Sequence, residues 1–235
     1  MTGRNVSSGM TRTEKLLGGG LLAVYAVVLP WAADPVFDLI GRLSGAIVSN
    51  GIRDAAYYYI LFALTLIAFR RYLGRNARAF FDHAGRALVS VGMGLAAFYG
   101  LNELVFRLLR MLGLGQANLN DQAILARMGS APRSTVLTLV FLAPLVEEVL
   151  FRGYIFGNLK EVSRPAAYLV SCLFFAFLHV WPFAVSGRDL SYLLVVVQYL
   201  VPGAVMAWTF ERSGSLWGSV LLHGVVNGIS VWSVR

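Results

Sequence analysis

The chain has 235 residues, of which 57% are hydrophobic and 14% charged, and its mean hydropathy is +0.67. A soluble domain carries roughly a quarter charged residues, so this composition excludes an ordinary soluble domain and favours a polytopic helical membrane protein. The net charge of +8 does not indicate nucleic-acid binding. The basic residues stand at the ends of apolar segments, where the positive-inside rule and anionic lipids place them. We therefore expect an all-α transmembrane bundle whose partner is the lipid bilayer and not nucleic acid.

Seven apolar segments are long enough to predict membrane spans. They are Leu16–Ala33, Ile52–Phe69, Ala87–Leu109, Ser134–Gly157, Ala166–Val185, Leu190–Phe210 and Leu216–Val234. Between the first two, apolar residues recur at helical spacing over residues 36–47, which predicts a helix at the outer interface or a re-entrant helix. After the second span, the arginine-rich segment 70–86 predicts a helix on the cytoplasmic interface. The expected fold is thus about seven spans with one or two interfacial helices.

Basic residues in the N-terminal tail and in residues 70–86 predict a multi-pass protein of the cell membrane with its N-terminus in the cytoplasm. The longest loop, Arg110–Arg133, fits either a cap over the helices or a plain surface loop. The only cysteine, Cys172, lies in an apolar segment and predicts a packing role, because one cysteine cannot form a disulfide within the chain. We expect residues 1–235 to form a single transmembrane domain.

The fourth expected span holds three ionisable side chains, Glu147, Glu148 and Arg152. An ionisable group at membrane depth costs at least ~2.5 kcal/mol and marks a functional site or a buried ion pair. Glu148 and Arg152 are four residues apart and share a helix face, which predicts an ion pair. Glu147 points about 100° away from Glu148. It needs another partner or water, and a carboxylate that faces water is a candidate general base.

Two later spans carry further polar groups, His179 in the fifth and His223 with Asn227 in the seventh. His223 and Asn227 are four residues apart and project toward one point. A histidine changes between donor and acceptor near neutral pH, and an asparagine supplies an amide donor that does not titrate. All these groups lie near mid-depth or in the cytoplasmic half, so they could converge on one cavity that opens to the cytoplasm. Base, histidines and amide donor are the parts of a water-activating hydrolase.

Four motifs in this order resemble those of the CAAX prenyl protease type II and bacteriocin-processing (CPBP, also called Abi) family of intramembrane endopeptidases. They are Glu147-Glu148-x-x-x-Arg152-Gly153, Phe175-x-x-x-His179, Glu211-Arg-Ser-Gly-Ser-Leu-Trp217 and His223-x-x-x-Asn227. The resemblance places a catalytic core at about residues 134–230. The helices of residues 1–133 match only as generic membrane helices.

The resemblance implies hydrolysis of a peptide bond in a membrane-associated substrate that can be lipid-modified. Glu147 and His179 would then activate water, His223 and Asn227 would stabilise the oxyanion, and Glu148 with Arg152 would support the site. The family has been described both as metal-dependent and as glutamate-dependent.

Two histidines and a carboxylate suit catalytic zinc, whereas the amide of Asn227 is a poor zinc ligand and a good oxyanion donor. We therefore expect glutamate-type chemistry without a cofactor, and the alternative is zinc held by Glu147, His179 and His223. A non-catalytic role is also open at this stage, because buried Glu and His chains occur in transporters and a bacteriocin-immunity protein could simply bind its peptide.

Overall fold

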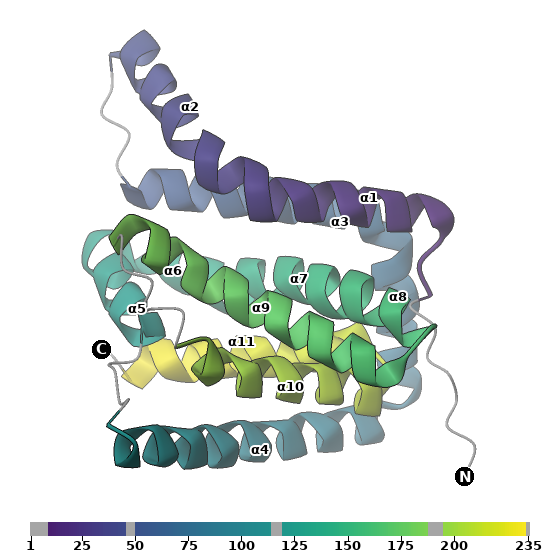
Figure 1. Ribbon diagram of the computed structural model, residues 1–235. Helices are drawn as coiled ribbons and strands as arrows, with labels where there is room; N and C mark the ends of the chain where they lie inside the picture. Colours follow the sequence, from purple (N-terminus) through teal and green to yellow (C-terminus); the bar gives the residue numbers. More distant parts are fainter. Residues whose placement is uncertain (1–8, 46–49, 114–118, 188–194, 234–235) are drawn as a thin grey trace.

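The computed structural model describes residues 9–45, 50–113, 119–187 and 195–233, and every regular element within them is helical. Figure 1 shows these helices stacked side by side as a bundle. In chain order they are α1 Arg12–Ala23, η1 Val24–Val28, α2 Leu29–Ser44, α3 Asn50–Asp82, α4 Ala84–Met111, α5 Leu119–Ser130, α6 Pro132–Leu137, η2 Thr138–Leu142, α7 Ala143–Glu148, η3 Val149–Phe156, α8 Gly157–Lys160, α9 Arg164–Gly187, α10 Val196–Ser213 and α11 Leu216–Ser233. Elements η1, η2 and η3 are π-helical. The expected all-α class is confirmed.

Three helical stretches of the described residues are long and apolar enough to cross a membrane: Ala84–Met111, Pro132–Lys160 and Arg164–Trp181. A fourth would be the pair Arg12–Val28 and Trp31–Ser44, which is bent by 71°. Helices occupy the described parts of all seven expected segments, which is consistent with a helical membrane bundle, and the number of seven spans stays a prediction. The expected start of the sixth span at Leu190 and the end of the seventh at Val234 lie outside the described residues.

The structure adds detail to the sequence-based expectation in three connecting segments. The arginine-rich segment 70–82 is helical, as expected, and a kink at Phe69 (φ −110°, ψ 16°) separates it from the first part of α3. The segment Arg110–Arg133, expected as a cap or a plain surface loop, contains the helix α5, so a plain loop does not describe it. The amphipathic segment after the first span continues from η1 as α2, which leaves the bundle at the upper left of Figure 1.

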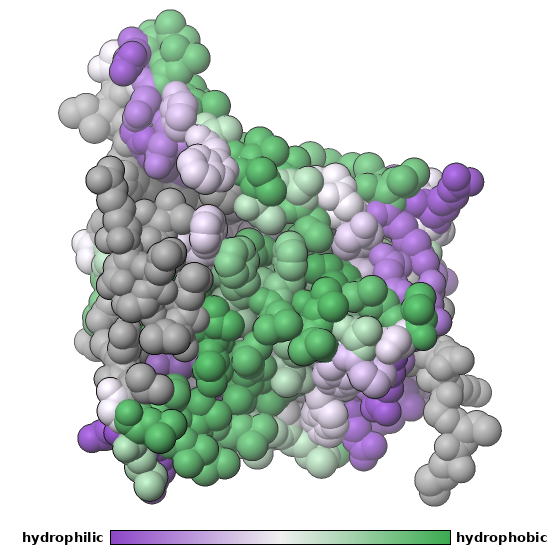
Figure 2. Space-filling model, viewed as in Figure 1, coloured by the Kyte–Doolittle hydropathy of each residue, from purple (hydrophilic) through white to green (hydrophobic). Residues whose placement is uncertain are grey.

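The flanks of the bundle carry exposed apolar side chains. Ile67 of α3, Val89 of α4 and Leu169 of α9 are 72%, 62% and 62% exposed. Figure 2 shows a broad hydrophobic band across one face, with hydrophilic residues at the right-hand edge, where α1 begins and α8 meets α9. Soluble monomers rarely expose so much apolar surface, whereas lipid accommodates it.

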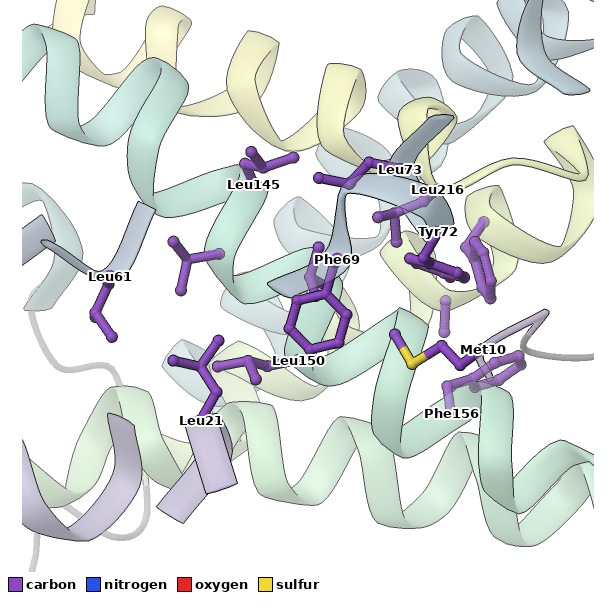
Figure 3. Packing of buried hydrophobic residues seen from close by; sticks show 14 of the residues in the cluster. Met10, Leu21, Leu61, Phe69, Tyr72, Leu73, Leu145, Leu150, Phe156 and Leu216 are labelled. Atoms are coloured by element: carbon purple, nitrogen blue, oxygen red, sulfur yellow. The ribbon is translucent and has the colours of Figure 1, made fainter. Parts of the chain in front are cut away.

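The main hydrophobic core joins helices from both halves of the chain. Figure 3 shows Leu21 of α1, Phe69 and Tyr72 of α3, Leu150 of η3 and Leu216 of α11 packed together. One core is therefore shared by the generic helices of residues 1–133 and the motif-bearing helices of residues 134–230. This packing fixes α1 and α3 against the helices that carry the polar residues.

The kink in α3 is held by a carboxylate of α1. A break in a helix leaves backbone N–H groups of the following turn without helical partners. Glu14 accepts one of them, the N–H of Tyr72, at 3.0 Å, and pairs with Arg75 at 2.9 Å. The side chain of Glu14 is 6% exposed, so this contact locks the start of α1 to the second half of α3.

Candidate active site

The polar residues of the fourth expected span lie in the densest part of the bundle. Glu148 and Arg152 are fully buried, and Oε1 of Glu148 accepts a hydrogen bond from Nη1 of Arg152 at 2.8 Å. Nη2 of Arg152 donates to the carbonyl oxygen of Gly203 in α10 at 3.1 Å. The guanidinium also lies over the ring of Phe175, 4.5 Å from its centroid. The ion pair expected from the four-residue spacing is present, and it ties η3 to α9 and α10.

Gly203 lets α10 approach α9 closely enough for this contact. A Cβ atom at position 203 would lie 3.2 Å from the Cα of Cys172. Small residues at helix interfaces are the usual means of close packing in membranes. Cys172 itself is buried at this crossing, which agrees with the expected packing role.

The second function of Glu148 is to hold a histidine. Its Oε1 also contacts Nδ1 of His223 in α11 at 2.9 Å. A carboxylate paired with an arginine accepts hydrogen bonds, so Nδ1 of His223 carries the shared proton. In the neutral imidazole, Nε2 then bears the lone pair. Glu148 therefore sets the tautomer and the orientation of His223.

His179 is oriented in the same way by the backbone. Its Nδ1 lies 2.8 Å from the carbonyl oxygen of Phe175, one turn earlier in α9. A carbonyl oxygen only accepts, so Nδ1 is the donor and Nε2 bears the lone pair in the neutral ring. The rings of Phe175 and Tyr199 flank the imidazole at centroid distances of 4.2 and 5.1 Å.

Glu147 completes the arrangement. Its side chain is 6% exposed, and its Oε2 lies 3.7 Å from Nε2 of His179 and 3.9 Å from Nε2 of His223. Oε2 has no hydrogen-bond partner among the described residues, whereas Oε1 accepts from the hydroxyl of Tyr25 at 3.2 Å. One carboxylate oxygen and two ring nitrogens from three helices thus face one another. A water molecule between them could donate to two of these acceptors.

The side chain of Asn227 is held by a hydrogen bond to a backbone carbonyl. The π-helix η2 pairs the N–H of Ala143 with the carbonyl of Thr138, so the next carbonyl, that of Leu139, would need the N–H of residue 144. Residue 144 is Pro144, which has none. Nδ2 of Asn227 donates to Leu139 at 2.8 Å instead. The amide carries a second N–H, which remains available.

A cavity of about 750 Å³ reaches the two histidines and Asn227, beside which Glu147 lies. Its lining includes His179, His223 and Asn227 together with aromatic and aliphatic side chains of α4, α10 and α11. The lining extends to Arg110 and Ser233, near the C-terminal ends of α4 and α11. In Figure 1 these ends lie on the left, opposite the turn from α3 into α4. Relative to the arginine-rich segment, the cavity therefore lies toward the other end of the bundle from the one we expected.

The structure brings together all six residues selected from the sequence, but not all in the expected manner. Asn227, the expected oxyanion donor, uses one of its two amide N–H groups for a hydrogen bond to the backbone. Tyr25 was missed, although it is the only side chain with a hydroxyl group in the expected span Leu16–Ala33. Glu103 forms an exposed ion pair with Arg107 at 2.7 Å and also lines the cavity.

The fit of a metal ion can be tested on the donor set. Zinc binds nitrogen and oxygen ligands at about 2.0–2.2 Å. The described residues include no group of three or more His, Cys, Asp or Glu side chains arranged to hold a metal ion.

The chain matches one family model and several curated proteins. Residues 129–229 match the family model described as "Type II CAAX prenyl endopeptidase Rce1-like". The chain is 29% identical over 118 residues to "Putative membrane peptidase YdiL" of Bacillus subtilis (strain 168), a match that covers 50% of this chain and 43% of that protein. It is 28% identical over 86 residues to "UPF0177 protein YxdF" of Lactococcus lactis subsp. lactis (strain IL1403), covering 37% and 42%.

A third relative, "UPF0177 protein in abiGi 5'region" of Lactococcus lactis subsp. cremoris, is 31% identical over 93 residues, covering 40% of this chain and 35% of that protein. The matches thus span less than half the length of these curated relatives. No solved structure matches the chain at the significance applied to these relatives. The family resemblance expected from the motifs is confirmed over residues 129–229, which match the model of the Rce1-like type II CAAX prenyl endopeptidases.

Proposed function

We propose that this chain is an intramembrane endopeptidase that hydrolyses a peptide bond in a membrane-associated peptide or protein, including lipid-modified ones. The observation that supports this most is the position of Oε2 of Glu147 opposite Nε2 of both His179 and His223, at 3.7 and 3.9 Å. The Nδ1 atoms of both rings are already engaged, so the groups that face one another are acceptors for the protons of water. A family of membrane endopeptidases matches the same residues.

In the proposed reaction, water bound between Glu147 and His179 attacks the carbonyl carbon of the substrate. Its proton passes to Oε2 of Glu147, and a C–O bond forms while the carbonyl oxygen gains the negative charge. His179 holds the water through its Nε2 lone pair. The proton on Glu147 then moves to the leaving nitrogen as the C–N bond breaks, which balances the hydrolysis.

Two hydrogen-bond donors stabilise the negative charge on the tetrahedral intermediate in this proposal. His223, which Glu148 holds through Nδ1, donates from Nε2 when both ring nitrogens carry a proton. The second N–H of Asn227 is the other donor. Preorganised donors of this kind typically contribute about 10²–10³ in rate.

The cavity is the proposed substrate site. Its volume of about 750 Å³ falls within the range of small-molecule and peptide pockets. The aromatic lining by Phe98, Tyr99 and Phe106 suits apolar side chains of a peptide. With the N-terminus in the cytoplasm, as proposed from the arginine-rich segment, this cavity lies toward the outer half of the membrane.

The test compares membranes that contain the wild-type protein with membranes that contain Glu147→Gln. The substitution keeps the shape of the side chain and removes the base, so we expect cleavage to fall about 10²–10⁴-fold while the protein still inserts and folds. Mass spectrometry of peptides released from the two membranes identifies substrate and cleavage site together. Glu161→Gln, at an exposed ion pair with Lys15, is the matched control. Equal peptide patterns in wild type and Glu147→Gln would refute the peptidase.

The dependence on metal is tested on the same preparation. We propose chemistry without a metal, so activity should survive dialysis against a series of chelators. Chelated samples are then supplied with zinc or with manganese. Loss of cleavage that only one metal restores would show the zinc alternative, with Glu147, His179 and His223 as the ligands to examine.

A further inference from the structure

The first helix reaches the proposed catalytic base from outside the segment that matches the family. Tyr25 lies in η1, and its hydroxyl donates to Oε1 of Glu147 at 3.2 Å. We propose that Tyr25 is a positioning residue for Glu147: it anchors one carboxylate oxygen so that the other faces His179 and His223. This inference rests on the proposed function.

The need for an anchor follows from the chemistry of the glutamate side chain. Its last torsion is broad and nearly two-fold, so the side chain itself does not fix where each oxygen points. Ion pairing with Arg152 fixes Glu148, whereas no lysine or arginine of the described residues pairs with Glu147. The hydrogen bond from Tyr25 occupies Oε1, and Oε2 is left as the oxygen opposite both histidine Nε2 atoms.

The sequence brings α1 close enough for this contact. A Cβ atom at Gly18 would lie 2.5 Å from Cδ2 of Tyr154 in η3, and one at Gly19 would lie 2.9 Å from the hydroxyl of Tyr154. Only glycine permits this approach without displacing the tyrosine. This close approach holds the following turns of the first helix, including the π-helical η1, against η3, the element that follows Glu147 in the chain.

Aromatic packing fixes the ring that carries the hydroxyl. Tyr25 meets Phe151 edge to face at a centroid distance of 6.2 Å, and Phe151 meets Phe175 in the same way at 5.3 Å. Phe175 in turn lies 4.2 Å from His179. The phenol is thus part of a continuous aromatic row that ends at a catalytic histidine. Replacing Tyr25 with phenylalanine keeps this packing and removes only the hydroxyl.

The kinetic test is Tyr25→Phe, measured with the peptide identified in the membrane experiment. We expect kcat to fall about tenfold with little change in KM, because the loss of a hydrogen bond to a charged group frees Glu147 to rotate. Tyr154→Phe is the matched control, since it removes a hydroxyl at the same helix interface without touching Glu147. A wild-type kcat in Tyr25→Phe, or an equal fall in Tyr154→Phe, overturns the proposal.

A second measurement does not depend on activity. The infrared difference between wild type and Glu147→Gln isolates the carboxyl bands of Glu147, and the same difference is recorded in the Tyr25→Phe background. We expect the bands to shift when the phenol is removed and to stay in place in Tyr154→Phe. Bands that do not shift refute the role of Tyr25 even if the protein cleaves peptides. Shifted bands in a protein that cleaves nothing would support Tyr25 and refute the peptidase.

Discussion

Glu148 and Glu211 each hold several helices together through hydrogen bonds and ion pairs, but in different surroundings. Glu148 is fully buried in the centre of the bundle and accepts from Arg152 and from His223 of α11. Glu211, near the end of α10, is 15% exposed and accepts from Lys160 at 2.6 Å and from the start of α9, where Arg164 and Tyr168 both contact it at 2.8 Å.

The comparison shows how burial changes the contribution of similar ion pairs to stability. At the end of the bundle, water can replace a lost partner, so exposed ion pairs contribute about 0–1 kcal/mol. In the dry centre, the removal of one partner leaves a charge without compensation and costs about 3–5 kcal/mol. The central cluster also orients His223, whereas the cluster at Glu211 touches no residue of the proposed site. The cluster around Glu148 therefore affects both stability and the proposed reaction, whereas the cluster around Glu211 should affect stability alone.

The largest effect is expected for Glu148→Gln. The amide keeps the size of the side chain but leaves the guanidinium of Arg152 buried without its counter-charge. We expect the free energy of unfolding to fall by about 3–5 kcal/mol. Denaturant titration in detergent, followed by tryptophan fluorescence, measures this. Cleavage should be lost as well, because His223 loses the carboxylate that holds its ring in place.

The double variant Glu148→Leu with Arg152→Met separates these two losses. Replacing both members of a buried pair by apolar residues of similar volume is often neutral for stability. We expect the double variant to unfold near the wild-type midpoint and still to cleave nothing. A double variant that regains cleavage would contradict the role given to Glu148. One that stays as unstable as Glu148→Gln would contradict the account of the ion pair.

The sequence could predict the elements of this molecule better than their connections. Composition and apolar length predicted the helical class and the position of every long helix, because burial in lipid requires satisfied backbone groups. The kink at Phe69 was not foreseeable, because a backbone N–H group that follows the kink bonds to Glu14, a residue distant in sequence. The bend that leads α2 out of the bundle also had no local signal beyond Pro30 and Pro35.

The site shows the same limit. Four-residue spacing predicted the pair of Glu148 with Arg152, and motif order predicted that His179 and His223 would join them. Spacing gives depth and face along one helix but not the rotation of one helix against another. The bond from Tyr25 to Glu147 depends on that rotation, so the sequence alone offered only an isolated tyrosine.

An intermediate effect is expected for Asn227→Ala, which touches the site and the fold together. The substitution leaves the carbonyl of Leu139 without its donor, which costs about 1–2 kcal/mol. It also removes an oxyanion donor, so kcat should fall about 10²–10³-fold. Adding Pro144→Ala restores a backbone N–H at the π-helical position opposite Leu139. We expect this addition to recover stability but not kcat; recovery of both would reduce Asn227 to a structural role.

The smallest effect is expected for Glu211→Gln. Partial burial, the largest single influence, raises the pKa of Glu211, but hydrogen bonds from Arg164, Lys160 and Tyr168 together outweigh it and lower the pKa below its ordinary value. A carboxylate with a lowered pKa in the folded state stabilises the fold above its unfolded pKa, about 4.3. That contribution is lost as the pH falls below this value toward the folded pKa.

At neutral pH we therefore expect Glu211→Gln to unfold about 0.5–1 kcal/mol more easily than wild type and to cleave at the wild-type rate. The difference in stability should shrink as the pH falls below about 4, because only the wild-type protein has a carboxylate to protonate. Denaturant midpoints at a series of pH values measure both trends. A cleavage defect in Glu211→Gln as large as that of Glu148→Gln would show that the two clusters are coupled, since the 15% exposed carboxylate would then act on the chemistry through α10.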